Sequence, residues 1–217
     1  HSLGEYSALS CANYLDFNET IKILRIRGNA MQNSVHQGDG GMLAVLGSTI
    51  KDIEKILVEN EKNFKAFIAN DNTEGQLVIS GKINDLEKLS DILKNKKIKN
   101  IKLPVSAPFH CNLMIKAKEI MGHELQKIRF QKSNNILISN VTANEIKNVD
   151  ELKSLLIDQI ERRVRWRESV IKMINKGVNQ FIEIGPGKVL TGLIKRIDKN
   201  VKTISINAIS DIESLKI

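Results

Sequence analysis

The stretch FKAFIANDNTEGQLVISG, residues 64–81, sets the fold class of the central part of the chain. FKAFIAND and QLVISG are rich in apolar and β-branched residues, a composition typical of strands. The four residues NTEG between them contain the Asn and Gly that turns favour. We therefore predict two consecutive strands joined at residues 72–75.

The sequence on either side of these strands continues the alternation of strands and helices. A helical pattern, TIKDIEKILVENEK, precedes them after the short apolar strand GMLAVLG, and a second one, KINDLEKLSDILKNK, follows them before the strand NIKLPV. The resulting order, βαββαβ, is the split pattern of a ferredoxin-like unit. We predict such a small subdomain over residues 41–105.

The two flanking parts, residues 1–40 and 106–217, form a second alternating pattern. Strand–helix alternation of this kind predicts a mainly parallel sheet covered by helices, into which the small subdomain is inserted. The predicted helices are residues 1–15, 16–35, 111–128, one long or two short helices within 149–177, and 189–197; the predicted strands are 134–140, 179–184 and 202–207.

Composition places the chain among soluble globular proteins. It has 217 residues, of which 41% are hydrophobic and 27% charged, and no apolar run reaches the length of a membrane span. Two cysteines far apart in the sequence, Cys11 and Cys111, indicate reduced thiols in a cytoplasmic compartment. The His, Cys and Asp residues lack the spacing of metal ligands, so we predict no metal.

The net charge of +8 makes an acidic partner plausible. The lysines are interspersed with acids, and aromatic residues make up only 4% of the chain. A nucleic-acid surface that stacks bases on aromatic rings is therefore not expected.

Ser2 lies in the motif H-S-L-G, with Gly4 two residues later. This is the second half of a G-x-S-x-G elbow, which exposes a nucleophilic serine at the start of a helix. A serine before a helix is also a common N-cap. The motif alone favours the cap and leaves the nucleophile open.

Arg27 projects from the apolar stripe of the second predicted helix, between Ile23 and Met31. A charge facing the interior needs an anionic partner. That partner is either a core carboxylate or the carboxylate of a substrate, held in a bidentate grip.

His110 follows Pro108 and Phe109 where the chain re-enters the larger part, a position from which it could meet Ser2. Lone loop histidines are more often structural. The turn Gly185-Pro186-Gly187 precedes a helix and could receive a phosphate, although the pattern favours a tight structural turn.

Taken together, these motifs resemble one family over essentially the whole chain. The sequence is similar to the malonyl-CoA:acyl carrier protein transacylases of bacterial type II fatty-acid synthesis, which implies an α/β-hydrolase-like large subdomain. The motifs are HSLGEYSAL (1–9), RGNAMQ (27–32), GQLVISG (75–81), LPVSAPFHCNLM (103–114), ISNVTA (138–143) and EIGPGKVLTGLIKRI (183–197).

The resemblance implies a ping-pong acyl transfer with assigned roles. Ser2 would be the nucleophile, His110 its general base, and the backbone carbonyl of Gln159 would orient the histidine in place of an acid. Arg27 would bind the malonyl carboxylate, and the Leu3 backbone N–H would donate to the oxyanion.

The same resemblance implies the substrates and partners. Phe109, just before the histidine, matches the malonyl-type pattern, since its ring leaves little room for a branched acyl unit. The substrates would be malonyl-CoA and an acidic, phosphopantetheinylated acyl carrier protein, with no further cofactor. We expect a cytoplasmic monomer without membrane contact, whose carrier protein docks on Lys188, Lys195 and Arg196.

The chain departs from the family pattern at two places. It lacks the N-terminal G-Q-G-S-Q motif, whose Gln supplies the second oxyanion donor, so we expect an N-terminally truncated and weakened or inactive enzyme if the 217 residues are the whole molecule. Residues 163–166 read RVRW where many relatives have N-P-V-x-W. The alternatives are a polyketide-type or trans-acting acyltransferase, and a serine hydrolase or thioesterase with the same Ser–His pair.

Overall fold

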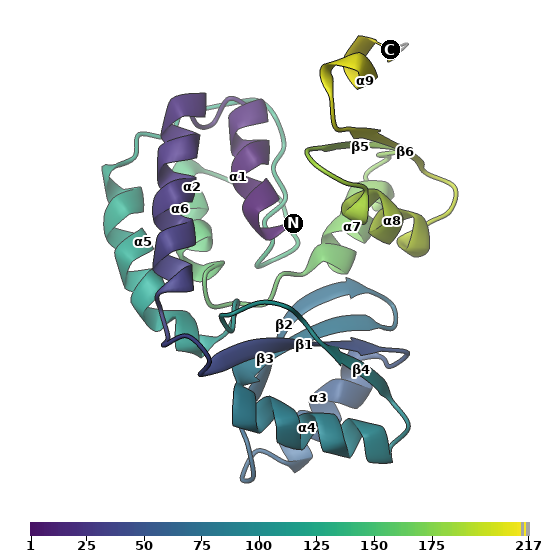
Figure 1. The fold of residues 1–217 in the computed structure, drawn as a ribbon. Helices are drawn as coiled ribbons and strands as arrows, with labels where there is room; N and C mark the ends of the chain where they lie inside the picture. The colour runs from purple at the N-terminus through teal and green to yellow at the C-terminus, as the bar shows by residue number, and fades with distance from the viewer. Residues whose placement is uncertain (214, 216–217) are drawn as a thin grey trace.

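A four-stranded antiparallel sheet, in the order β2-β3-β1-β4, forms one layer of the computed structural model, which describes residues 1–213 and 215 (Figure 1). β2 and β3 are the strands predicted around residues 72–75, and the strand order is that of a ferredoxin-like unit. The strands are β1 (Gly40–Leu46), β2 (Ala66–Thr73), β3 (Gln76–Lys82) and β4 (Lys99–Lys102).

Two helices, α3 (Ile50–Glu59) and α4 (Ile83–Asn95), cover one face of this sheet (Figure 1). α3 begins with a capping box, in which the Thr49 side chain accepts from the Asp52 N–H and Asp52 accepts from the Thr49 N–H. The core between helices and sheet is aliphatic apart from one Phe, and includes Val45, Ile53, Phe64, Leu77, Ile79, Leu89 and Leu93. We call residues 40–102 the sheet unit.

Helices α1 (Ser2–Cys11), α2 (Phe17–Gln32), α5 (Ile115–Lys127) and α6 (Val149–Asp158) pack together beside the sheet unit (Figure 1). A short 3-10 helix, η1 (Asn112–Met114), leads into α5. The Asp16 carboxylate accepts from two N–H groups at the start of α2, as the sequence predicts. These four helices, here called the helical layer, share a core that includes Tyr6, Leu9, Ile23, Met121, Leu125 and Leu152.

The C-terminal part contains a two-stranded parallel sheet of β5 (Gln180–Ile184) and β6 (Lys202–Ile206). α8 (Val189–Ile197) connects the two strands, and α7 (Trp166–Asn175) packs against α8. The chain continues into α9 (Ile209–Glu213). This strand–helix–strand unit is the parallel βαβ arrangement expected for the larger part.

Two sequence predictions need correction or refinement. The strand expected over residues 134–140 is wrong, because this stretch forms only the isolated bridge Ile138–Glu145 around a turn in which the Ala143 N–H donates to the Ser139 carbonyl. The region 149–177 forms two helices, α6 and α7, with residues 159–165 between them. The division of the chain at residues 41 and 105 into two subdomains remains a prediction.

The segment between α6 and α7 joins the edge of the sheet unit. The Val164 N–H donates to the Ala69 carbonyl at 2.8 Å, and the Asp71 N–H donates to the Val164 carbonyl at 3.0 Å. This pairing holds the start of α7 against β2. Across the described part of the chain, no helix is both long and apolar enough to cross a membrane.

Candidate active site

Ser2 is the first residue of α1, and its hydroxyl does not cap the helix. His1 is the N-cap residue, and its Nδ1 accepts from the Ser2 N–H at 3.0 Å. The Ser2 hydroxyl instead accepts a hydrogen bond from Arg27 Nη2 at 2.6 Å. The interpretation of Ser2 as a simple cap is therefore wrong, because a neighbouring side chain does the capping and leaves Oγ facing another helix.

His1 also ties this turn to the rest of the molecule. Because Nδ1 accepts, the proton lies on Nε2, which donates to Asn72 Oδ1 on β2 at 2.8 Å. The imidazole ring lies 5.6 Å from the ring of Trp166, at the start of α7. Ser2 is thus held between α2, the sheet unit and α7.

Arg27 is a buried cation in the middle of α2, as the apolar stripe predicts. Its Nη2 donates to Ser2 Oγ and to Gln159 Oε1, the latter at 2.8 Å, and its guanidinium lies 5.5 Å from the centre of the Tyr6 ring. No described residue accepts from its Nε–H, which is buried. Burial lowers the pKa of Arg27, while the nearby Tyr6 and Glu5 raise it.

Arg27 was expected to contact an anionic group directly, and the described residues do not provide one. Among the described residues, Arg27 forms no ion pair with a carboxylate; its polar partners are a hydroxyl and an amide oxygen. The buried cation therefore has one N–H donor, at Nε, without an acceptor among the described residues.

Gln159 connects the serine, the arginine and the histidine. It follows the last residue of α6 and is fully buried. Its amide Oε1 accepts from Arg27, its Nε2 donates to the Ser2 carbonyl at 2.9 Å, and its own carbonyl accepts from His110 Nδ1 at 2.8 Å. One residue thus contacts two side chains, of Arg27 and His110, and the backbone of Ser2, which come from three distant parts of the sequence.

His110 is buried and has a positive φ of 61°. Burial, and then the charge of Arg27, lower its pKa to about 4, so the ring is neutral at neutral pH. Its Nδ1 donates to the Gln159 carbonyl, so in the neutral ring the lone pair lies on Nε2. The Ser80 hydroxyl donates to the carbonyl of the preceding Phe109 at 2.5 Å and anchors this loop on β3.

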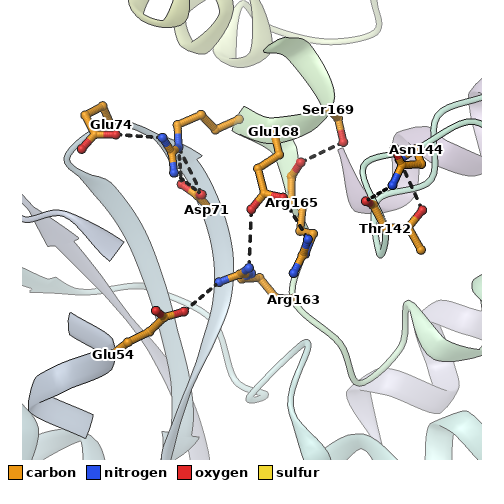
Figure 2. A network of polar contacts seen from close by, with 10 residues as sticks. Glu54, Asp71, Glu74, Thr142, Asn144, Arg163, Arg165, Glu168 and Ser169 are labelled. Atoms are coloured by element: carbon orange, nitrogen blue, oxygen red, sulfur yellow. Dashed lines mark hydrogen bonds and ion pairs between the residues drawn. The ribbon is translucent and has the colours of Figure 1, made fainter. Parts of the chain in front are cut away.

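A cavity of about 500 Å³ borders His110 between the sheet unit and the segment that precedes α7. Leu57 and Phe67 line it on the sheet side, and Arg163 and Arg165 on the other. Figure 2 shows that both arginines are paired: Arg163 contacts Glu54 and Glu168, and Arg165 also contacts Glu168. Because Glu54 and Glu168 balance the charges of Arg163 and Arg165, these two arginines do not by themselves indicate an anion-binding site.

The other residues singled out from the sequence lie outside this group. Lys188, Lys195 and Arg196 are exposed on α8 or just before it, and Arg196 donates to Gln76 Oε1 at 2.8 Å. Leu3 is 58% exposed on the first turn of α1.

The predicted strand-to-helix turn at Gly185 and Gly187 is present, and both glycines have positive φ. The phosphate interpretation of this turn is wrong, because the Glu183 carboxylate accepts from the N–H groups of Leu190 and Thr191 at the start of α8. Among the described residues, no group of three or more His, Cys, Asp or Glu side chains could hold a metal ion.

The sequence analysis missed Glu5 and Asn140, which are buried beside Gln159. Gln159 Nε2 donates to Glu5 Oε2 at 2.5 Å, and the Asn140 N–H lies 3.4 Å from both Glu5 oxygens. A signal for Glu5 exists in the sequence, because it shares a helical face with Tyr6 and Leu9, as Arg27 does with its apolar neighbours.

Comparison with known proteins gives the class of this site and then its family. Residues 1–212 match the family model of the acyl transferase domain. The malonyl CoA-acyl carrier protein transacylase of Bacillus subtilis is 40% identical to this chain over 220 residues, which cover 100% of the chain and 68% of that protein. The enzyme of the same name from Escherichia coli is 38% identical over 97% of the chain and 68% of its own length.

The solved structures agree. A malonyl CoA-acyl carrier protein transacylase from Clostridium perfringens superposes with a TM-score of 0.94, at 40% identity over 98% of this chain and 67% of that one. A malonyl-transacylase solved in complex with a type II polyketide acyl-carrier protein has a TM-score of 0.93, at 34% identity over 99% and 70%. The chain belongs to the malonyl CoA-acyl carrier protein transacylase family, and the predicted α/β fold class is confirmed.

Proposed function

We propose that this chain moves a malonyl group from malonyl-CoA to the phosphopantetheine thiol of an acyl carrier protein, through a malonyl ester on Ser2. The contact between Arg27 and Ser2 carries the proposal, because it puts a buried cation with an unpaired N–H beside a serine hydroxyl. Such a cation suits an acyl group that ends in a carboxylate. The names of the relatives support the same reaction.

In the first half-reaction, Ser2 Oγ attacks the thioester carbonyl carbon of malonyl-CoA. His110 Nε2 takes the hydroxyl proton, and the resulting imidazolium is stabilised by the Gln159 carbonyl on Nδ1. The tetrahedral intermediate collapses with cleavage of the C–S bond. The departing CoA sulfur takes the proton from His110, which leaves malonyl-Ser2 and a neutral imidazole.

In the second half-reaction, the phosphopantetheine thiol gives its proton to His110 and attacks the ester carbonyl of malonyl-Ser2. Cleavage of the C–O bond returns the proton to Ser2 Oγ and restores the enzyme. We assign Leu3 the backbone N–H that donates to the oxyanion in both steps, because the first N–H groups of a helix have no partner within the helix.

The rest of the assignment concerns substrate choice and partner. Phe109, half-buried next to His110, would limit space at the α-carbon of the acyl group. The exposed cations Lys188, Lys195 and Arg196 would attract an acidic carrier protein. The chain would act in the cytoplasm as a monomer and need no cofactor beyond its two substrates.

Mass spectrometry after incubation with malonyl-CoA tests this function. We expect a malonyl adduct on Ser2, its loss in Ser2→Ala, and weaker labelling in Arg27→Ala. Acetyl-CoA should label Arg27→Ala as well as it labels the unchanged protein, since acetyl has no carboxylate. Equal labelling of the unchanged protein by malonyl-CoA and acetyl-CoA would contradict the assignment.

The same experiment separates transfer from hydrolysis. A serine hydrolase would release free malonate without an acyl carrier protein, and the Ser2 adduct would decay at the rate of that release. A transacylase should keep the adduct until a phosphopantetheine thiol is added.

A further inference from the structure

Glu5 is a buried carboxylate to which the proposed reaction assigns no role. It lies three residues after Ser2 on α1, so both side chains are on the same face of the helix. Only 5% of its surface is exposed. Burying a carboxylate costs free energy unless hydrogen bonds compensate for the lost water. The hydrogen-bond partners of Glu5 therefore indicate its role.

The strongest of those contacts is with the side-chain amide of Gln159. Gln159 Nε2 donates to Glu5 Oε2 at 2.5 Å, while Gln159 Oε1 accepts from Arg27 Nη2 at 2.8 Å. The amide therefore bridges a carboxylate and a guanidinium, with its donor end toward the anion and its acceptor end toward the cation.

An amide has two orientations that differ by a half-turn and exchange its oxygen and nitrogen. In the reversed orientation, the Gln159 NH₂ group would face the Arg27 NH₂ group, donor against donor, and the amide oxygen would face the Glu5 carboxylate. Glu5, together with the Ser2 carbonyl, therefore favours the orientation that supports Arg27, and Glu5 makes the shorter of the two contacts. A buried residue without an acceptor in its place would weaken that selection, because the Ser2 carbonyl, 2.9 Å from the same Nε2, would be the main acceptor left.

We propose that Glu5 is a positioning residue, which fixes the Gln159 amide with its oxygen toward Arg27 and so keeps the Arg27 guanidinium in place to bind the acyl carboxylate. This inference rests on the proposed function, because it takes Arg27 as the group that recognises malonyl. It predicts that loss of the Glu5 acceptor harms the binding of malonyl-CoA and spares that of acetyl-CoA.

Protonation of Glu5 gives a second way to test the contact between Glu5 and the Gln159 amide. Burial raises the pKa of Glu5 to about 7, while the hydrogen bonds from Gln159 and the Asn140 N–H and the charge of Arg27 lower it. The remaining titratable neighbour is Tyr6, whose own pKa is raised. Because protonated Glu5 still offers an oxygen that can accept from Gln159, malonyl binding should change only modestly near neutral pH in the unchanged protein and lose that change in Glu5→Gln.

Two substitutions separate the acceptor from the charge. Glu5→Gln keeps an oxygen that can accept from Gln159, and Glu5→Met keeps the approximate volume without a comparable acceptor. Glu19→Met, which removes a half-exposed carboxylate on α2, is the control. Binding of malonyl-CoA and acetyl-CoA is measured by calorimetry in a Ser2→Ala background, so that no transfer occurs, and circular dichroism confirms that each variant is folded.

We expect Glu5→Met to weaken malonyl-CoA binding by about tenfold and acetyl-CoA binding by less than about twofold, the size of one lost charge-assisted hydrogen bond. Glu5→Gln should stay within about threefold for both ligands, and Glu19→Met should change neither. An equal loss for both ligands in Glu5→Met, or no loss for malonyl-CoA, would overturn the proposal.

A spectroscopic readout keeps the inference testable even if malonyl-CoA does not bind. The side-chain NH₂ signal of Gln159, assigned by its absence in Gln159→Glu, should exchange slowly with solvent in the unchanged protein and in Glu5→Gln. It should exchange faster in Glu5→Met. Unchanged exchange in Glu5→Met refutes the positioning role, whereas failure of both CoA esters to bind refutes only the proposed function.

Discussion

The sheet unit and the helical layer differ in the side chains that their interiors contain. The interior of the sheet unit between β1–β4 and helices α3 and α4 is built from apolar side chains. The helical layer buries an arginine, a glutamate and, at its border, a glutamine and a histidine. Removing apolar surface from water stabilises a fold, whereas burying charge costs free energy.

The difference indicates that the helical layer, which contributes the candidate site, gives up folding stability by burying charged groups. The pKa values of Arg27 and His110 are lowered and that of Glu5 is raised, chiefly by burial. These shifts mean that water would stabilise the charged forms better than the protein does. The sheet unit also buries a charge, Asp71 on β2, but that residue lies outside the apolar core under α3 and α4. Substitutions in that core and in the helical layer should therefore have separable effects.

The largest effect is expected from His110→Ala in the helical layer. Loss of the general base should lower malonyl transfer by about a thousandfold, while the sheet unit keeps its secondary structure. Transfer is measured with malonyl-CoA and an acyl carrier protein. A variant that retains a tenth of the activity would show that His110 is not the base.

In the unchanged enzyme, the same residue predicts the acid limb of the pH profile. Because the pKa of His110 is about 4, protonation should remove the base only as the pH falls toward that value. A limb that stays near pH 6.5 would argue against the buried, neutral imidazole.

Leu89→Ala should destabilise the sheet unit without changing the candidate site. Leu89 is fully buried in the core under α4, so the truncation should lower the free energy of unfolding by about 2–5 kcal/mol. Val58→Ala, at a position 68% exposed on α3, is the control and should change little. Urea unfolding measures both. Faster loss of Ser2 labelling than of folded protein in Leu89→Ala would show that the two regions are coupled.

The contact between the two regions should respond more moderately. Arg167 on α7 donates to both oxygens of Asp71, which is fully buried on β2, and to the exposed Glu74. Figure 2 labels these two acids. Asp71→Asn should cost about 1–3 kcal/mol, because it leaves a partly buried guanidinium without its main partner. Glu74→Gln should cost less than about 1 kcal/mol. Equal losses in thermal unfolding would mean that burial does not distinguish the two contacts.

The smallest effect is a pH dependence in which two groups oppose each other. The folded pKa of His110, about 4, lies below its ordinary 6.5, so the unfolded chain binds more protons between these values and stability falls as the pH falls. The folded pKa of Glu5, about 7, lies above its ordinary 4.5, so stability falls as the pH rises through that window.

Between pH 4.5 and 6.5 these two contributions should largely cancel in the unchanged protein. Glu5→Gln should uncover the His110 slope, at most about 1.4 kcal/mol per pH unit, with stability lost toward acid. Thermal unfolding over this range measures it. Identical pH dependence in both proteins would show that Glu5 is not the opposing group.

Local pattern was sufficient for the sheet unit. The apolar runs and the amphipathic stretches of residues 41–105 predict all six of its elements, because each element follows from the spacing of its own residues. The strand expected at 134–140 failed because a turn at Ser139–Asn144 captures the backbone hydrogen bonds that a strand needs.

The residues of the candidate site are predicted only in part by local sequence pattern. The stripe on α2 marks Arg27 as an inward-facing charge, and H-S-L-G marks Ser2 as either a cap or a nucleophile. Glu5 lies in a stripe of the same kind, within the motif HSLGEYSAL that also contains Ser2. Only the family resemblance pointed to Gln159, since nothing in LIDQIERRV distinguishes it from an exposed glutamine.

The order of elements, the inward charge of Arg27 and the membership in the transacylase family are all written in the sequence, because helix and strand periods act over a few neighbouring residues. The identity of the residues that meet at Ser2 is not. Arg27 and Gln159 are 132 positions apart, and His110 and Gln159 are 49 apart. Such contacts form only when packing of the helical layer excludes water and forces each buried polar group to find a partner.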